Sequence, residues 1–306
     1  MATQSKIVTH FGVALREELS DVITNIDPTE TPFISNIGKG KTSSYKTEWL
    51  TDTLSAAALN QQTEAAPASA AAIGAGARLV NYITISAKWF DISDVLEAAD
   101  TAGSLGKISY QTAKALKELA RDMEYNLINE ATGSATDAYK TRGLKYWQSS
   151  TSTNYGPFTS AATSNLLTED IFTARQQAVW NQGAKVDFVL APAAQKKRIS
   201  SFNGANRLTV NTDMTNKKIL NVVDFIENDF GVARIYIERH IAADSTYYDW
   251  VFYLQKDLWK LLNMLPVKVE KLARTGLSQQ VQISTTYTLR CGTEKGNASS
   301  QYLYNV

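Results

Sequence analysis

Hydrophobic residues near the N-terminus recur every three or four positions, as they do on one face of a helix. This apolar stripe consists of Phe11, Leu15, Leu19, Val22 and Ile26. Its spacing predicts an amphipathic helix that ends before Pro28. Because a proline disfavours helix at the residue before it, residues 29–34 are expected to be extended. The glycines at residues 38–41 predict a flexible turn.

Two strand-like segments follow, separated by a run of mostly small residues. Residues 45–49 and 78–91 favour strands, whereas residues 55–77 hold many alanines, one proline and two glycines. We therefore expect a two-stranded loop whose tip, residues 55–77, is extended and mobile. Because an isolated hairpin is marginally stable in water, such a loop indicates that another copy of the chain lies beneath it.

The longest helical pattern covers residues 108–132, a length of about 38 Å at 1.5 Å per residue. Leu116, Leu119 and Met123 are expected on its buried stripe, and Lys117 on its polar face.

The remaining chain alternates helices and strands before it becomes rich in strands. Residues 133–165 have little periodicity and indicate a passage between domains. A helix at residues 168–183, a strand at 185–191 and a helix from Pro192 predict a small α/β domain. Strands are then expected at residues 232–238, 250–254, 267–272 and 281–291. The polar tail from Gly292 is expected at the surface.

Composition excludes several classes of protein. The chain of 306 residues is 44% hydrophobic and 20% charged, with a net charge of +1, as in an ordinary soluble protein. That balance argues against a dedicated nucleic-acid binder. No apolar run approaches the roughly 20 residues that span a bilayer, and no signal peptide is present, so we expect a soluble protein of a cytoplasm-like compartment. The lone Cys291 is expected to be a buried thiol.

No reactive constellation stands out in the sequence. Gly40-Lys41-Thr42 matches the end of a P-loop, but a strand-like segment follows where the motif requires a helix. His10 and His240 are far apart, and neither belongs to a pattern typical of metal or Ser-His-Asp sites. We therefore predict no catalytic residue, no cofactor and no metal site. Aromatic side chains are expected in the core and at subunit contacts.

An ordered set of short motifs resembles the major capsid (head) proteins of tailed bacteriophages with the Hong Kong 97-like fold. In chain order the motifs are TPFISNIGKGK at 31–41, EWLTDTL at 48–54, RLVNY at 78–82, AKALKELARDME at 113–124, NDFG at 228–231, LARTG at 272–276 and TYTL at 286–289. The resemblance spans most of the chain.

The resemblance implies an α+β fold divided as in that family. It implies an N-terminal arm at residues 1–41 and an extended two-stranded loop at 42–91. A peripheral domain with a long spine helix follows at 92–150 and an axial α/β domain at 151–250, and residues 251–306 return to the peripheral domain. Some relatives cross-link covalently through a lysine of the extended loop. Here no lysine occurs between Lys46 and Lys88, so that chemistry is not expected.

The resemblance also implies a function and its partners. The chain is expected to self-assemble into hexamers and pentamers of an icosahedral head that encloses double-stranded DNA through non-specific contacts. A portal and a separate scaffolding protein are expected partners. The resemblance also allows a decoration protein as a partner. The expected locations are the virion and, during assembly, the host bacterial cytoplasm, without a membrane.

Particular residues are expected at the assembly interface, and alternative functions stay open. The expected contact residues are Phe11, Leu15, Leu19, Phe33, Trp49, Tyr82 and Trp89. An encapsulin-like cellular compartment shares the fold but holds enzyme cargo. A soluble enzyme built on the small α/β domain, or a monomeric binding module, would form no shell.

Overall fold

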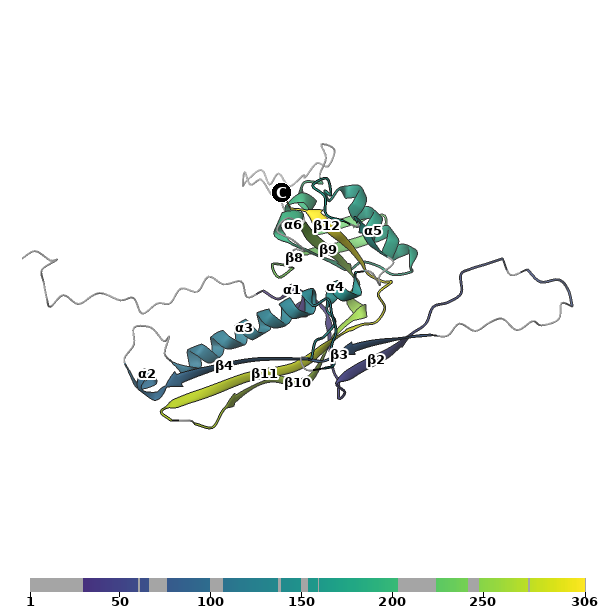
Figure 1. The fold of residues 1–306 in the computed structure, drawn as a ribbon. Helices are drawn as coiled ribbons and strands as arrows, with labels where there is room; N and C mark the ends of the chain where they lie inside the picture. The colour runs from purple at the N-terminus through teal and green to yellow at the C-terminus, as the bar shows by residue number, and fades with distance from the viewer. Residues whose placement is uncertain are drawn as a thin grey trace, which may run out of the picture.

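The computed structural model describes residues 30–59, 61–65, 76–99, 107–136, 139–149, 154–158, 160–202, 224–241, 248–274 and 276–305. Within these ranges the chain forms a four-stranded, a six-stranded and a two-stranded sheet. Figure 1 shows a long helix along the four-stranded sheet, the six-stranded sheet above, and the two-stranded sheet projecting to the right. The α+β class is confirmed, whereas the helix expected at residues 11–26 lies outside the described residues.

The four-stranded sheet has the order β1 (Gly38–Lys41), β10 (Trp259–Lys271), β11 (Ser278–Cys291) and β4 (Thr84–Ser93). β10 and β11 form a long antiparallel hairpin, and β1 pairs with β10 in parallel. The prediction of a flexible turn at residues 38–41 is therefore wrong. A Cβ atom at Gly40 would lie 2.7 Å from a methyl group of Leu262, so a side chain there would require the Leu262 side chain to shift.

The long helix α3 (Ile108–Asn129) lies along this sheet. It ends three residues before the predicted end, where Gly143 packs against it. The Gly143 N–H donates to the Glu130 carbonyl at 2.8 Å, and a Cβ atom there would lie 2.7 Å from the Leu127 carbonyl oxygen. A side chain at residue 143 would thus displace the end of α3.

The buried face of α3 differs in part from the predicted one. Leu119 and Met123 are buried as expected, but Leu116 is 36% exposed and Ala115 takes its place toward the sheet. Ala115 and Leu119 pack with Ile283 of β11. A small side chain at this position lets the helix approach the strand, so the line of contact does not follow the largest residues.

Two leucines of α3 should therefore respond very differently to truncation. Leu119→Ala should lower the free energy of unfolding by about 2–5 kcal/mol, because it opens a cavity against Ile283. The same change at Leu116 should cost less than about 1 kcal/mol, as should Lys117→Ala on the polar face. Urea unfolding of the soluble subunit measures all three. Equal losses at Leu116 and Leu119 would contradict the observed helix phase.

The six-stranded sheet forms the second body of the subunit. Its order is β5 (Tyr155–Pro157), β12 (Ala298–Tyr304), β9 (Tyr248–Leu254), β6 (Phe188–Ala191), β8 (Gly231–Ile237) and β7 (Phe225–Asn228). It carries α5 (Glu169–Asn181), which begins where the Thr168 hydroxyl accepts a hydrogen bond from the Ile171 N–H. α6 (Ala193–Ser200) follows Pro192, as the sequence predicts.

The C-terminal strand is buried, so the prediction of a surface tail from Gly292 is wrong. β12 lies between β5 and β9, and Ser299, Ser300 and Leu303 are fully buried, so the tail is not a surface segment. Buried polar groups require hydrogen bonds, and the Ser299 hydroxyl donates to the Gln148 carbonyl at 2.8 Å. Asn297 Oδ1 accepts from the Trp259 indole N–H at 2.9 Å. The six-stranded sheet thus includes β9 to Leu254 and β12, and residues 251–306 do not all return to the four-stranded sheet.

The segment after residue 29 is helical rather than extended. α1 (Pro32–Asn36) has proline at its first position, where the missing N–H costs nothing. Its next two amides, at Phe33 and Ile34, donate to the Glu124 carboxyl group on α3. This cap replaces the intrahelical acceptors that a helix N-terminus lacks.

Candidate assembly surfaces

The extended loop is built on a two-stranded sheet of β2 (Lys46–Thr51) and β3 (Ala77–Tyr82). The predicted continuous strand at residues 78–91 is interrupted at Ile83, because β3 pairs with β2 whereas β4 pairs with β11. The Ile83 N–H donates to the Tyr45 carbonyl at 3.1 Å. The loop is therefore anchored at the point where it leaves the body of the subunit.

Asn81 is the buried centre of this anchor. Its side-chain amide donates to the carbonyls of Arg142 and Leu289, and its Oδ1 accepts from the backbone N–H groups of Arg142 and Tyr82. Asn81 has no exposed surface. One side chain thus connects β3, β11 and the segment before α4 (Leu144–Trp147).

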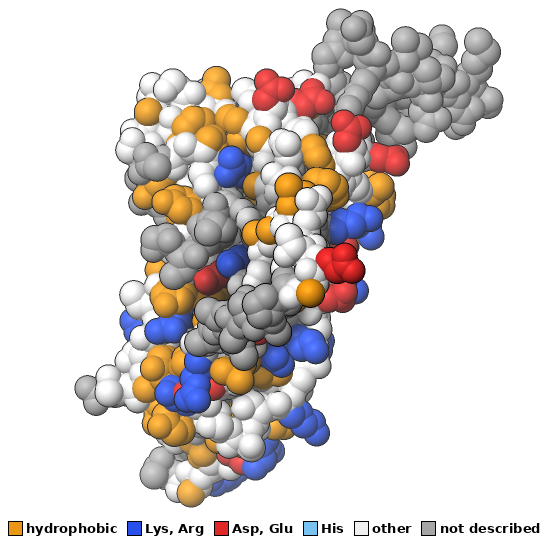
Figure 2. Space-filling model, turned by 90° about the vertical axis from the view of Figure 1, so that its right-hand side faces the viewer, with side chains coloured by type: hydrophobic (Ala, Val, Ile, Leu, Met, Phe, Trp, Pro, Cys, Tyr) orange, Lys and Arg blue, Asp and Glu red, His pale blue; other side chains and the backbone are white. Residues whose placement is uncertain are grey.

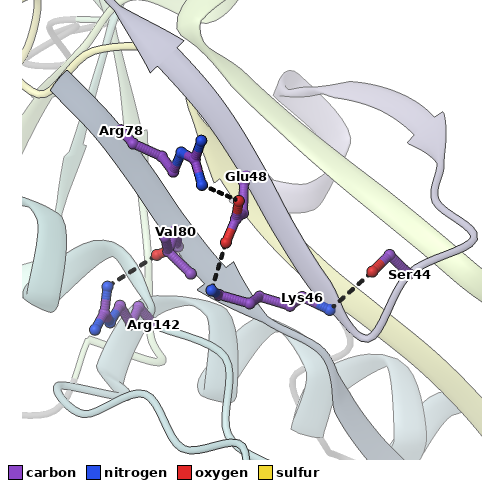
Figure 3. A network of polar contacts seen from close by, with 6 residues as sticks. All are labelled: Ser44, Lys46, Glu48, Arg78, Val80 and Arg142. Carbon is purple, nitrogen blue, oxygen red and sulfur yellow. Dashed lines mark hydrogen bonds and ion pairs between the residues drawn. The ribbon is translucent and has the colours of Figure 1, made fainter. Parts of the chain in front are cut away.

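A polar network on the outer side of the loop complements this anchor (Figure 3). Glu48 forms ion pairs with Lys46 of its own strand and with Arg78 of β3. The hydrogen bond from Lys46 lowers the pKa of the Glu48 carboxyl group. Arg142 Nη1 donates to the Val80 carbonyl at 2.8 Å, and its guanidinium lies 5.7 Å from the Tyr82 ring centroid. These contacts fix the direction in which the loop projects.

From the end of β2 onward, the described part of the loop is exposed and carries three leucines among small and polar residues. Leu50, Leu54 and Leu59 are 76%, 99% and 93% exposed, and we call them the loop leucines. Residues 60 and 66–75 of the expected tip lie outside the described residues. Leu54 and Leu59 bury almost no surface within the subunit, so their side chains are accessible to a neighbouring molecule.

The expected contact residues fall into four groups, of which Trp89 is the last. Phe33 and Trp49 are buried in the subunit's own core, where their rings lie 6.0 Å from Trp259 and 5.6 Å from Trp147. Their assignment to a subunit contact is therefore corrected: both side chains stabilise the fold. Tyr82 is half-buried beside Arg142. Phe11, Leu15 and Leu19 lie outside the described residues.

Trp89 is the remaining expected residue, and it is 75% exposed. Its neighbour Lys88 pairs with Asp122 of α3 at 2.7 Å, so Trp89 points to the opposite side of the sheet. Ile85 lies on the same side, opposite Thr286, which is paired with Leu265 of β10. We call Ile85, Trp89 and Leu265, all more than half exposed, the open sheet face.

Charges of both signs surround the exposed apolar groups. On the face seen in Figure 2, acidic side chains gather near the top, and Lys and Arg lie mainly over the lower half, with hydrophobic groups between them. A surface of this kind suits specific protein contacts better than it suits a continuous nucleic-acid track.

The side chains of the described residues give little indication of a catalytic or metal-binding site. Cys291 is fully buried, as predicted, and burial raises the pKa of its thiol well above the usual range. Such a thiol is a poor nucleophile. No group of three or more potential metal ligands occurs in the described part of the chain. Within the same residues, no helix has the length and apolar character that crossing a bilayer requires.

The sequence pattern did not identify two buried glutamates, Glu124 and Glu238, or the exposed loop leucines. Glu124 lies one residue after Met123 and four before the buried Ile128. This spacing could have predicted that Glu124 lies on the buried face of the helix. The sequence predicts an extended loop here, but nothing in its pattern distinguishes these leucines as contact residues.

Comparison with known proteins identifies the family. The sequence model of the SU10 major capsid protein matches residues 2–302. A search of curated protein sequences finds no significant match. The fold resembles a structure from Microbacterium phage Oxtober96, with a TM-score of 0.67 and 12% identity over 98% of this chain and 99% of that one.

Two further structures show the breadth of this fold. The capsid of the cyanophage P-SCSP1u has a TM-score of 0.61 and 15% identity, over 97% of this chain and 96% of that one. The holo-SrpI encapsulin complex from Synechococcus elongatus PCC 7942 has a TM-score of 0.62 and 10% identity, over 96% of this chain and 94% of that one.

The subunit thus has the Hong Kong 97-like fold of shell-forming structural proteins. The chain belongs to the SU10 major capsid protein family, and it is a structural protein of a phage head rather than an enzyme.

Proposed function

We propose that this major capsid protein assembles into the hexamers and pentamers of an icosahedral head and that the extended loop of each subunit lies on its neighbour. Two features of the loop carry the proposal: its root is fixed by Asn81, and exposed leucines lie beyond that root. Leu54 and Leu59 keep 99% and 93% of their surface exposed in the single subunit. Burial of a leucine side chain contributes about 1.5–3 kcal/mol, and a closed shell repeats each contact many times.

In this arrangement the four-stranded sheet with α3 is the peripheral domain and the six-stranded sheet is the axial domain. The open sheet face, which includes Trp89 on the edge strand β4, is a second contact surface. The N-terminal arm, expected at residues 1–41, contributes further contacts through Phe11, Leu15 and Leu19. Double-stranded DNA fills the head without sequence-specific contacts, since the chain carries a net charge of only +1.

A portal, a separate scaffolding protein and a decoration protein are the further partners that such a head uses. Assembly takes place in the host bacterial cytoplasm, and the mature protein resides in the virion.

A single substitution in the loop tests this function. Leu54→Asp should abolish closed shells, because it places a charge where we expect an apolar contact. The melting temperature of the unassembled subunit should not change, because Leu54 is 99% exposed. Negative-stain microscopy and analytical ultracentrifugation measure assembly.

Leu54→Met is the matched control and should still form shells, because it preserves apolar volume. Normal shells from Leu54→Asp would show that the loop is dispensable.

The encapsulin-like alternative has one observation in its favour, the fold shared with the holo-SrpI encapsulin complex. The contents of purified shells distinguish the two functions. Nuclease-protected double-stranded DNA supports a phage head, whereas packaged enzyme without DNA supports a compartment.

A further inference from the structure

An open cleft lies where the first described residues meet the six-stranded sheet. It has a volume of about 540 Å³. One wall consists of residues 30–32 and 35, and the others come from Lys196 of α6, Asp224 before β7 and residues 234–237 of β8. Figure 1 shows α1 directly below β8 at this place. We call it the arm-root cleft, because residues 1–29 join the described chain here.

Arg234 gives the arm-root cleft an exposed positive charge that two aromatic rings hold in place. Its guanidinium carbon lies 5.4 Å from the ring centroid of Phe225 and 5.0 Å from that of Tyr236. A guanidinium that stacks on aromatic rings keeps the N–H groups at its edge available as donors. Arg234 is therefore oriented to bind a carboxylate.

The acids of the cleft do not supply that carboxylate. Asp224 pairs with Lys196 at 3.8 Å, and within the described residues neither Asp224 nor Glu30 forms an ion pair with Arg234. Ile237, which also lines the cleft, leaves its side chain exposed. A matching occupant thus presents a carboxylate with an apolar side chain beside it.

The residues just before Glu30 have this combination. They read Ile26-Asp27-Pro28-Thr29, so an acid follows directly after an isoleucine. Asp27 is three residues from Glu30, and an extended chain of that length spans at most about 11 Å. Residues 17–29 contain four acids and neither lysine nor arginine, which complements the positive charge of Arg234.

A second segment outside the described residues also joins the chain at the cleft, because residues 203–223 lead into Asp224. Its charge does not suit Arg234. It contains Arg207, Lys217 and Lys218 but only one acid, Asp213. The excess of positive charge favours residues 26–28 as the occupant.

We propose that the arm-root cleft binds residues 26–28 of the same chain, with the Asp27 carboxylate paired to Arg234 and Ile26 in contact with Ile237. The N-terminal segment then leaves the subunit beside β8 in a defined direction. This contact lies within one subunit, so it goes beyond the proposed shell function and does not depend on it.

Cysteine cross-linking of the soluble full-length subunit tests the proposal. Ile26→Cys and Ile237→Cys replace the apolar contact and leave the ion pair in place, and Cys291 is buried and does not compete. A short bismaleimide should join the two new thiols within one chain. Arg234→Glu should lower the initial cross-linking rate about fivefold, because an attractive charge pair becomes a repulsive one.

A charge swap and a matched control make this test specific. Asp27→Lys reverses the same pair from its other side and should slow cross-linking equally, so one folded variant of the two is sufficient. Asp27→Lys combined with Arg234→Glu should restore the rate to within about twofold of the parent. Asp21→Lys changes an acid of the same segment outside residues 26–28 and should leave the rate unchanged.

Three results would overturn the proposal: a rate that neither reversal changes, a charge swap that restores nothing, or equal slowing by Asp21→Lys. A mixture of subunits with one new cysteine each tests for exchange between copies. Cross-links between chains with none within a chain would assign the cleft to a neighbour's segment and also overturn the proposal. Because unassembled subunits are measured, a failed cleft contact leaves the shell function intact, and failed assembly leaves the cleft contact intact.

Discussion

Replacing Asn81 with alanine is expected to lower the free energy of unfolding by about 3–6 kcal/mol. The change leaves the Leu289 carbonyl and the backbone N–H groups of Tyr82 and Arg142 without the partner that Asn81 now supplies, while the Arg142 carbonyl keeps the indole N–H of Trp147. Each buried group left unsatisfied costs about 1–3 kcal/mol, and some relaxation or water entry reduces the sum. Urea unfolding of the soluble subunit, followed by circular dichroism, measures the loss.

Asn36→Ala is the control for this experiment. Asn36 is half-buried and its side-chain amide donates one local hydrogen bond, to the Pro32 carbonyl at 2.7 Å. Its removal should cost about 1 kcal/mol. If Asn81→Ala costs no more than Asn36→Ala, Asn81 is not the anchor of the extended loop.

Deleting residues 1–27 is expected to abolish shells of defined size while leaving a folded subunit. The described body keeps its contacts, because α1 starts at Pro32 and is held by Glu124 through Phe33 and Ile34. The deleted segment contains the apolar stripe that we propose for contacts with neighbours. Circular dichroism should show near-normal secondary structure, and negative-stain microscopy should show only small oligomers.

A matched pair of triple variants makes this test sharper. Serine at Phe11, Leu15 and Leu19 removes the apolar stripe and should act like the deletion. Serine at Arg16, Glu17 and Asp21 changes polar positions of the same segment and should allow assembly. Unfolding of the deleted protein would assign residues 1–27 to the subunit's own core. Normal shells would place the essential interface elsewhere.

The comparison of predicted and observed buried residues in α3 shows how far a periodic pattern can predict a fold. The pattern predicted the helix and the burial of Leu119 and Met123, because helical spacing places such residues on one side. It misplaced Leu116, since packing against Ile283 favours the small Ala115 at closest approach. Periodicity gives the direction of a face, whereas the exact contact line depends on the partner surface.

β12 shows the opposite case, a buried element without a hydrophobic signal. Its buried serines depend on hydrogen bonds to residues far away in sequence, such as the bond from Ser299 to the Gln148 carbonyl. A pattern based on hydrophobicity reads polar residues as exposed. No local rule could have predicted this burial, because the compensating groups come from the tertiary fold.

The candidate contact residues show the same limit. Sequence alone could not separate Trp49, which packs on Trp147, from Trp89, which is 75% exposed. Alternation along β4 places Lys88 and Trp89 on opposite faces, but only the ion pair of Lys88 with Asp122 identifies the face covered by α3. The sequence singled out these aromatic residues by type, and only the fold separates the buried ones from the exposed Trp89.

The strand order also determines how late in translation each sheet can be completed. β1 and β4 find their partners in β10 and β11, which are translated more than 160 residues after β4 ends. β5 likewise waits for β12, about 140 residues downstream. At typical rates of about 5–20 residues per second, both sheets remain incomplete on the ribosome for many seconds. Nascent chains therefore lack finished contact surfaces, and polymerisation is confined to subunits whose translation is nearly complete.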